Sequence, residues 1–165
     1  MNPCVIVPVT DDKSVAEVAL LAHQIWLEHY TPIIGQAQVA YMLQELQSEA
    51  AIQKQINEGY LYFLVEDGQK RDIGYFSVAP REKELFLGKF YVSSEARGKG
   101  YGRQMMEFIQ GMAREKGFPR IFLTVHKRNP SVAVYQKFGF AIWGPVVTDI
   151  GQGFFMDDYR MGLEI

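Results

Sequence analysis

A glycine-rich segment is the feature of this sequence that could do chemistry. It reads Arg97-Gly98-Lys99-Gly100-Tyr101-Gly102 and lies between a strand-like run ending at Val92 and a helix-like run beginning near Tyr101. Glycines let the backbone approach a ligand and turn N–H groups toward it, because no Cβ blocks the way. The N-terminus of a following helix adds unpaired N–H groups and the positive end of a dipole. The segment therefore predicts an anion site suited to a pyrophosphate, with Arg97 and Lys99 adding charge at its rim.

Other nucleotide motifs fit this segment badly. A dinucleotide fingerprint that began at Gly98 would need Gly or Ala where Arg103 stands, and no stretch matches the phosphate loop that ends in Gly-Lys-Ser/Thr. Taken alone, the segment has a plain connecting turn as its alternative interpretation. A second motif further along the chain narrows the choice. It reads Asn129-Pro130-Ser131-Val132-Ala133-Val134-Tyr135-Gln136-Lys137-Phe138-Gly139-Phe140.

Together the two motifs resemble those of the GNAT superfamily of N-acetyltransferases. The resemblance spans residues 84–140, and the order of elements elsewhere agrees with it. It implies a single N-acetyltransferase domain over residues 1–165, acetyl-CoA as co-substrate, and direct attack of an amine on the thioester without an acyl-enzyme. It also implies that residues 97–102 bind the pyrophosphate and that Asn129 contacts the cofactor arm. The backbone around Phe90, Tyr91 and Val92 would pair with pantetheine.

Tyr135 matches the tyrosine that the superfamily uses, and we expect it to act as the general acid. A departing thiolate has a reference pKa of about 8.5 and a phenol one of about 10, so the phenol can donate its proton with a modest mismatch. The alternative interpretation is an ordinary half-buried aromatic residue. The general base is left open. Many members carry a glutamate on the strand before the glycine loop, but residues 86–91 contain no carboxylate.

Two clusters could build the acceptor site. Glu28-His29-Tyr30 is expected at the end of the first helix, and Asp157-Asp158-Tyr159 follows a loop near the C-terminus. Acidic residues there would suit a cationic amine such as a polyamine. Each cluster also has an interpretation as cap, turn or surface residues. No spacing of histidine and cysteine suggests a metal site.

Composition excludes several classes of protein. The formal net charge of −2 argues against a general nucleic-acid binder, which needs a basic face. The single cysteine, Cys4, cannot form an internal disulfide and lies in an apolar run where packing is its expected role. No segment approaches the length of a membrane span, and the N-terminus lacks a signal-peptide pattern. We therefore expect a cytoplasmic protein with no membrane partner.

Periodicity predicts a mixed α/β fold with a central sheet of about seven strands. Strands are expected at residues 4–9, 60–66, 72–78, 84–92, 121–126, 140–147 and 154–164. Helices are expected at residues 14–28, 37–47, 49–58, 101–113 and 129–139, the first opened by a capping box of Ser14 and Glu17 and followed by a break at Pro32 and Gly35. The order of strand, helix and strand around residues 92–121 predicts a parallel pair. The resemblance implies that these two strands splay apart and admit pantetheine.

These observations lead to one hypothesis and three rivals. We expect an N-acetyltransferase that acts on a small amine such as a polyamine, an amino acid or an aminated xenobiotic. The rivals are a peptide or protein acetyltransferase, an acyl-CoA-binding sensor without turnover, and a nucleotide-dependent oxidoreductase supported only by the glycine count. A homodimer is left open, since Phe154-Phe155 could be either core or a dimer face.

Overall fold

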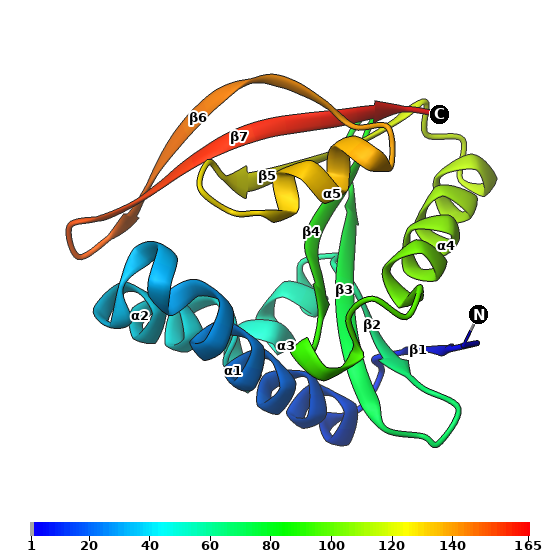
Figure 1. Ribbon diagram of the computed structural model, residues 1–165, viewed down its shortest axis with the longest axis horizontal. Coiled ribbons are helices and arrows are strands. Elements are labelled where there is room, and N and C mark those ends of the chain that lie inside the picture. Colours follow the sequence, from blue (N-terminus) through cyan, green and yellow to red (C-terminus); the bar gives the residue numbers. More distant parts are fainter. Residues whose placement is uncertain (1) are drawn as a thin grey trace. The chain divides into compact units, whose positions relative to one another are not determined.

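The computed structural model describes residues 2–165, which contain a mixed sheet of seven strands, as predicted (Figure 1). The strands hydrogen-bond in the order β1-β2-β3-β4-β5-β7-β6. They are β1 (Val5–Pro8), β2 (Leu61–Glu66), β3 (Asp72–Pro80), β4 (Leu85–Val92), β5 (Arg120–His126), β6 (Ala141–Gly151) and β7 (Phe154–Glu164). The helices are α1 (Asp12–Ile34), α2 (Gln36–Leu46), α3 (Glu49–Asn57), η1 (Ser94–Ala96), α4 (Tyr101–Glu115) and α5 (Ser131–Lys137).

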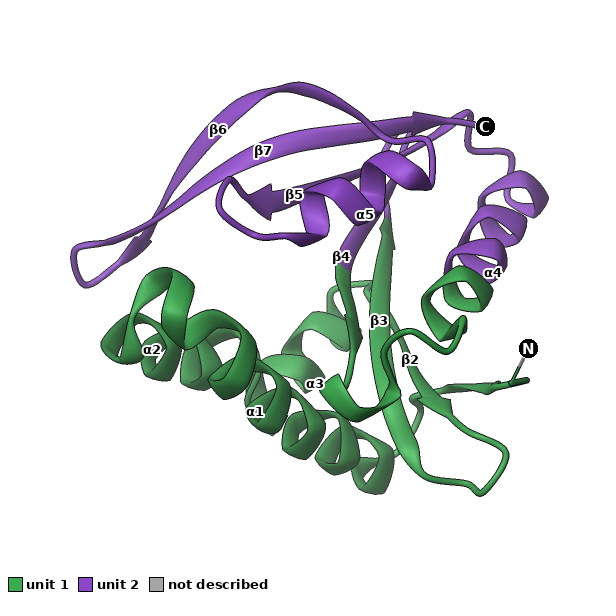
Figure 2. Cartoon of the chain, viewed as in Figure 1, with its two compact units in different colours: residues 1–79, 89–105 green, residues 80–88, 106–165 purple. Residues whose placement is uncertain are grey.

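The chain forms two compact units, which are coloured separately in Figure 2. Unit 1 comprises residues 1–79 and 89–105, and unit 2 comprises residues 80–88 and 106–165. Strand β4 and helix α4 each contribute residues to both units. The segments predicted to build the site are therefore divided between the units, and each unit is described by itself.

Unit 1 contains an antiparallel meander under three helices. Strand β1 pairs with β2 through Val5↔Glu66, and β2 pairs with β3 through Leu64↔Tyr75. Residues 73–79 of β3 are all buried, which is expected of a strand covered on both faces. Helix α1 packs against α2 and α3 and buries an apolar stripe at helical spacing. This stripe consists of Val15, Val18, Leu21, Ala22, Ile25, Trp26 and Tyr30.

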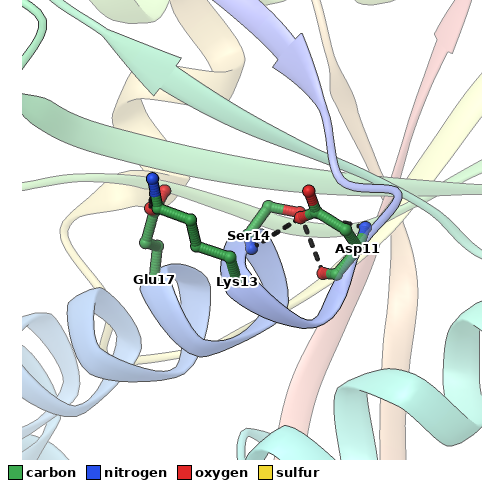
Figure 3. A network of polar contacts seen from close by, with 4 residues as sticks. All are labelled: Asp11, Lys13, Ser14 and Glu17. Atoms are coloured by element: carbon green, nitrogen blue, oxygen red, sulfur yellow. Dashed lines mark hydrogen bonds and ion pairs between the residues drawn. The ribbon is translucent and has the colours of Figure 1, made fainter.

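The capping box of α1 is real, but the predicted pair of residues is wrong. Asp11 is the N-cap, and its Oδ1 accepts from the Ser14 N–H (2.8 Å) while Ser14 Oγ accepts from the Asp11 N–H (3.3 Å; Figure 3). Glu17 instead lies 4.0 Å from Lys13 Nζ. The helix thus begins one turn earlier than predicted, because a serine can fill the role that the capping box usually gives to Glu or Gln.

The predicted break at Pro32 is also wrong, because Pro32 lies inside α1. The helix continues to Ile34 and ends at Gly35, which has φ +88° and donates its N–H to the Thr31 carbonyl (3.0 Å). A proline within a helix removes one hydrogen bond and crowds the preceding turn, yet packing of the apolar stripe can hold the helix together. One consequence is that Glu28, His29 and Tyr30 lie within α1 rather than at its end.

Unit 2 contains the predicted parallel pair. The start of β4 pairs with β5 through Leu85↔Ile121 and Phe86↔Phe122, and β5 pairs antiparallel with β7 along its whole length. Strands β6 and β7 form a long hairpin. The splay between β4 and β5 stays a prediction, because the later half of β4 belongs to unit 1. None of the helices in residues 2–165 has the length and apolar character that crossing a lipid bilayer requires.

Candidate functional site

The glycine-rich loop of unit 1 has the geometry of an anion site. Gly98 and Gly100 have φ values of +76° and +87°, a conformation that favours glycine, and residues 97–100 are exposed. Tyr101 is buried and anchors the start of α4. The backbone N–H groups of residues 98–103 have no hydrogen-bond acceptor in the part of the chain that the structure describes. Such a set of unpaired donors at a helix N-terminus suits a phosphate group.

Arg97 ties this loop to the end of β4. Its Nε donates to the Val92 carbonyl (3.1 Å), so the side chain predicted to carry charge at the rim also fixes the strand that precedes it. The Val92 carbonyl keeps a second lone pair, which is free to serve the pantetheine contact predicted there. Lys99 is exposed beside Gly98 and Gly100.

Tyr91 connects β4 to α1. Its ring centroid lies 5.7 Å from that of Trp26 and 5.3 Å from that of Tyr75, and its hydroxyl lies 3.4 Å from the hydroxyl of Tyr30. Gly74 of β3 sits directly beside it, since a Cβ at Gly74 would lie 2.6 Å from the Tyr91 carbonyl oxygen. Unit 1 thus brings together two residues that were predicted for different parts of the site, Tyr30 for the acceptor and Tyr91 for the cofactor.

The other two residues of the α1 cluster lie nearer the surface. Glu28 is exposed, and its Oε2 accepts from the Ser94 hydroxyl (3.0 Å) at the start of η1. His29 packs edge-on against Tyr30 with the ring centroids 4.8 Å apart. The cluster therefore has one buried aromatic member and two members at the rim.

Unit 1 also contains buried polar atoms that sequence reasoning missed. The Tyr75 hydroxyl donates to Gln47 Oε1 (3.2 Å), while Gln47 Nε2 has no hydrogen-bond partner among residues 2–165. Burial raises the pKa of Tyr75 well above 10, so this phenol stays protonated. On β4, burial lowers the pKa of Lys89 to about 8. No sequence signal marks Tyr75 and Gln47 as partners, because the contact between them joins β3 to the residue that follows α2.

In unit 2, Asn129 lies two residues before the start of α5, and Tyr135 lies within that helix. Asn129 is buried, and its Oδ1 accepts from the Ser131 N–H (2.9 Å). The predicted N-cap is off by one residue, because Pro130 occupies that position without a side-chain cap and Asn129 forms the preceding turn. Tyr135 is 8% exposed and packs edge-on against Phe140 with centroids 5.8 Å apart. Tyr135 is thus held by packing.

Asp157 and Asp158 are neighbours on β7 in opposite environments. Asp157 is exposed and forms an ion pair with Lys127 Nζ (2.9 Å). Asp158 is 4% exposed, and its carboxyl has no hydrogen bond or ion pair with any described residue. Burial, and then the charge of Asp157, raise the pKa of Asp158 to about 6, whereas Lys127 lowers it. Among residues 2–165, no three His, Cys, Asp or Glu side chains gather as a metal site.

Comparison with known sequences places these features in a family. The profile of the acetyltransferase (GNAT) family matches residues 22–140. The 5-NmdU N-acetyltransferase of Pseudomonas phage PaMx11 is 29% identical over 116 residues, which cover 67% of this chain and 74% of that protein. Streptothricin acetyltransferase of Streptomyces lavendulae is 32% identical over 79 residues, 47% of this chain and 42% of that protein. N-alpha-acetyltransferase 80 of Mus musculus is 32% identical over 69 residues, 42% of this chain and only 21% of that protein.

Solved structures show the same fold at low sequence identity. The PaiA N-acetyltransferase of Thermoplasma acidophilum, solved in complex with coenzyme A, has a TM-score of 0.77 at 17% identity and covers 99% of both chains. A GCN5-related N-acetyltransferase of Rhodopseudomonas palustris has a TM-score of 0.84 at 13% identity and covers 100% of this chain and 98% of that one.

Proposed function

The chain belongs to the acetyltransferase (GNAT) family, whose members take an acetyl group from acetyl-CoA, and we propose that it transfers this group to the primary amine of a small molecule. The observation that supports a small-molecule acceptor is the name of one relative, streptothricin acetyltransferase, whose acceptor is a small molecule. The acidic pair on β7 supports the same class, because carboxylates attract a cationic amine.

The residues that the sequence predicts for the co-substrate would each contact a different part of it. The unpaired N–H groups of residues 98–103, with Arg97 and Lys99, would bind the pyrophosphate. The backbone of Phe90, Tyr91 and Val92 would pair with the pantetheine arm, and Asn129 would contact that arm from unit 2. When bound, acetyl-CoA supplies an acetyl group already activated as a thioester.

The chain's remaining task is to position the amine and to move two protons. The ammonium group of the acceptor loses one proton, its nitrogen forms a bond to the carbonyl carbon and loses a second proton to solvent, and the carbon–sulfur bond breaks. Tyr135 would donate its phenolic proton to the departing thiolate and regain one from solvent. Cys4 has no role in this scheme, and burial raises the pKa of its thiol, which disfavours the nucleophilic thiolate.

A second candidate acceptor is a peptide N-terminus. The match to the mouse N-alpha-acetyltransferase favours it, although the match covers about a fifth of that protein. A peptide amine would need the same proton transfers, so only the acceptor distinguishes the two candidates.

Thiol release tests the proposal directly. The enzyme is mixed with acetyl-CoA and a panel of polyamines, amino acids, aminated antibiotics and short peptides, and free CoA thiol is measured. We expect steady release with at least one small amine and slower release with peptides. Tight acetyl-CoA binding without turnover across the panel would instead identify a sensor, and release with peptides alone would favour the second candidate.

A further inference from the structure

Asp158 is a buried carboxyl group that the fold does not use. It is 4% exposed, and neither of its oxygens has a partner among the described side chains and backbone groups. An unpaired buried carboxylate is costly, because it loses its hydration without gaining hydrogen bonds. A group kept under such conditions is a candidate for a role toward a ligand.

The groups around Asp158 within unit 2 explain its state. It stands opposite His126 on β5 and Val146 on β6, and the charges that act on it are those of Asp157 and Lys127. Lys127 is occupied by its ion pair with Asp157. Asp158 is therefore left without a cation of its own, although a cationic side chain lies nearby.

His126 is the neighbouring group that could compete for the role of base, and its hydrogen bonding argues against it. Its Nδ1 accepts from the Arg128 N–H (3.1 Å), so in the neutral ring the proton resides on Nε2. Burial and the charge of Arg128 lower the pKa of His126, which keeps the ring neutral. The basic lone pair of the neutral ring is the one on Nδ1, and it is engaged by the Arg128 N–H, while Nε2 carries the ring proton. Neither nitrogen then has a free lone pair that could take a proton.

We propose that Asp158 receives the ammonium group of the acceptor and takes the proton that the amine must lose before it attacks the thioester. This inference rests on the proposed function and supplies the base that β4 lacks. One proton moves from the ammonium nitrogen to an Asp158 oxygen, the nitrogen–carbon bond forms, and the carbon–sulfur bond breaks with a proton passing from Tyr135 to sulfur. The nitrogen, which is cationic again after the attack, loses its second proton to solvent, and Tyr135 regains its proton from solvent. Asp158 then releases its proton to solvent. The acceptors that fit are alkylamines that are cationic at neutral pH, including diamines.

The protonation state of Asp158 suits this role. A carboxyl with a pKa of about 6 is ionised at pH 7, yet it is more basic than an ordinary aspartate. When an ammonium ion binds beside it, the opposite charge should lower that pKa again. Binding therefore leaves a measurable signature that needs no turnover.

The first experiment is an NMR titration of carboxyl-labelled aspartate in the CoA-bound enzyme. Asp158→Asn identifies the resonance, and 1,4-diaminobutane is the probe. We expect a titration near pH 6 without the diamine and a shift to lower pH with saturating diamine. A carboxyl pKa near the ordinary value of about 4, or a carboxyl pKa that does not change when the diamine is added, would overturn the inference.

The second experiment compares turnover of Asp158→Asn with a matched control, Asp149→Asn. Asp149 is an exposed aspartate of the same hairpin whose Oδ1 accepts from the Gly151 N–H, an interaction that asparagine retains. With 1,4-diaminobutane at pH 7, we expect Asp158→Asn to lose about 10²- to 10⁴-fold in kcat/KM and the control to stay near wild type. The acid limb of the wild-type pH profile near 6 should vanish in Asp158→Asn alone.

A fluorinated acceptor separates proton removal from packing. In 2,2,3,3-tetrafluoro-1,4-diaminobutane the amines are far less basic, so they need less help to lose a proton. The loss caused by Asp158→Asn should then shrink to a few-fold, whereas a purely structural defect would affect both diamines equally and contradict the inference. Thiol release by wild type that persists in Asp158→Asn would also contradict it while leaving the proposed function intact. Absence of thiol release from wild type would instead refute the proposed function, and the NMR titration would still decide the role of Asp158.

Discussion

The β2–β3 turn and the loop before α4 are two glycine-containing turns of unit 1 that use their N–H groups in opposite ways. In the first, Asp67 Oδ1 accepts from the N–H groups of Gln69 (2.8 Å) and Arg71 (3.0 Å), and Oδ2 accepts from Arg71 Nε (2.8 Å). In the second, the N–H groups of residues 98–103 find no acceptor within the described chain. The N–H groups of the β2–β3 turn thus bind the carboxylate of that turn, whereas the N–H groups of the loop before α4 are available to an anionic ligand.

This difference separates polar groups that maintain the fold from polar groups available to a ligand. Asp67 is 6% exposed, covered by its own turn, and the hydrogen bond from the Arg71 backbone N–H is the main cause of its lowered pKa. Asp158 is buried to a similar extent but accepts no hydrogen bond from any of residues 2–165, and its pKa is raised. Burial alone therefore does not distinguish the two carboxylates. Their hydrogen-bond partners do, since Asp67 has three donors and Asp158 has none among the described residues.

The largest effect should come from blocking the open loop. Gly100→Val forces a branched side chain into a position with φ +87° on the surface expected to face the pyrophosphate, so acetyl-CoA binding should be abolished. Gly68→Val is the control, because a Cβ at Gly68 of the β2–β3 turn meets nothing within 4 Å. Calorimetry with acetyl-CoA measures both. Near-normal affinity in a folded Gly100→Val protein would show that the loop is a mere connection.

A smaller effect, confined to chemistry, is expected from Tyr135→Phe in unit 2. The phenyl ring keeps the packing against Phe140 and loses the transferable proton, so turnover should fall about 10²- to 10⁴-fold while acetyl-CoA affinity changes little. Single-turnover kinetics and calorimetry separate the two quantities. If affinity alone fell, Tyr135 would belong with the binding groups of the loop rather than with the catalytic groups.

Removing the internal anion should affect stability and leave function alone. Asp67→Ala leaves the N–H groups of Gln69 and Arg71 without their acceptor, and we expect the melting temperature to fall by several degrees. Asp67→Asn, which retains an acceptor oxygen, should lose less. Thermal unfolding and the calorimetric affinity for acetyl-CoA are the measurements. A loss of affinity without a loss of stability would reverse the roles assigned to the two turns.

The smallest expected effect is a pH dependence of opposite sign at the two carboxyls. The lowered pKa of Asp67 adds stability above about pH 4 that is lost as the pH falls through the folded-state pKa. The raised pKa of Asp158 favours the folded state when the group is protonated, and this stability is lost as the pH rises from about 4 to about 6. The free energy of unfolding of Asp158→Asn, measured with urea, should therefore rise by about 1 kcal/mol relative to that of wild type as the pH increases from 5 to 8. An unchanged difference between the two proteins would refute the unpaired state of Asp158.

Much of the fold could be predicted because its signals are local. The loop with glycines at positions 98, 100 and 102 and the apolar spacing of α4 can both be recognised from a short stretch of sequence. The order of strand, helix and strand then predicts the parallel pair of β4 and β5. The errors also have local causes. Ser14 can serve as N-cap or as the third residue of a capping box, and a proline at position 32 would end most helices that lacked so continuous a buried stripe.

The candidate site could be predicted only in part, since the state of its polar groups depends on distant segments. Asp157 and Asp158 are the same residue type at adjacent positions, yet one is exposed and paired while the other is buried and unpaired. Strand alternation puts them on opposite faces, but only the tertiary packing shows which face is covered. For the same reason, no pattern in the sequence distinguishes Gln47, whose Nε2 has no partner in the part of the chain that the structure describes, from an ordinary core residue.

Gly74 has a consequence for how this chain can vary. Any side chain there would press its first carbon against the Tyr91 carbonyl oxygen at 2.6 Å, and a backbone atom cannot move aside as a flexible side chain can. A library randomised at codon 74 and selected for folded protein should therefore return glycine almost exclusively. Gly74 has no side chain that could bind a ligand or react. In an alignment of distant sequences with this β3–β4 arrangement, we nevertheless expect glycine at position 74 to be as invariant as the glycines of the loop before α4.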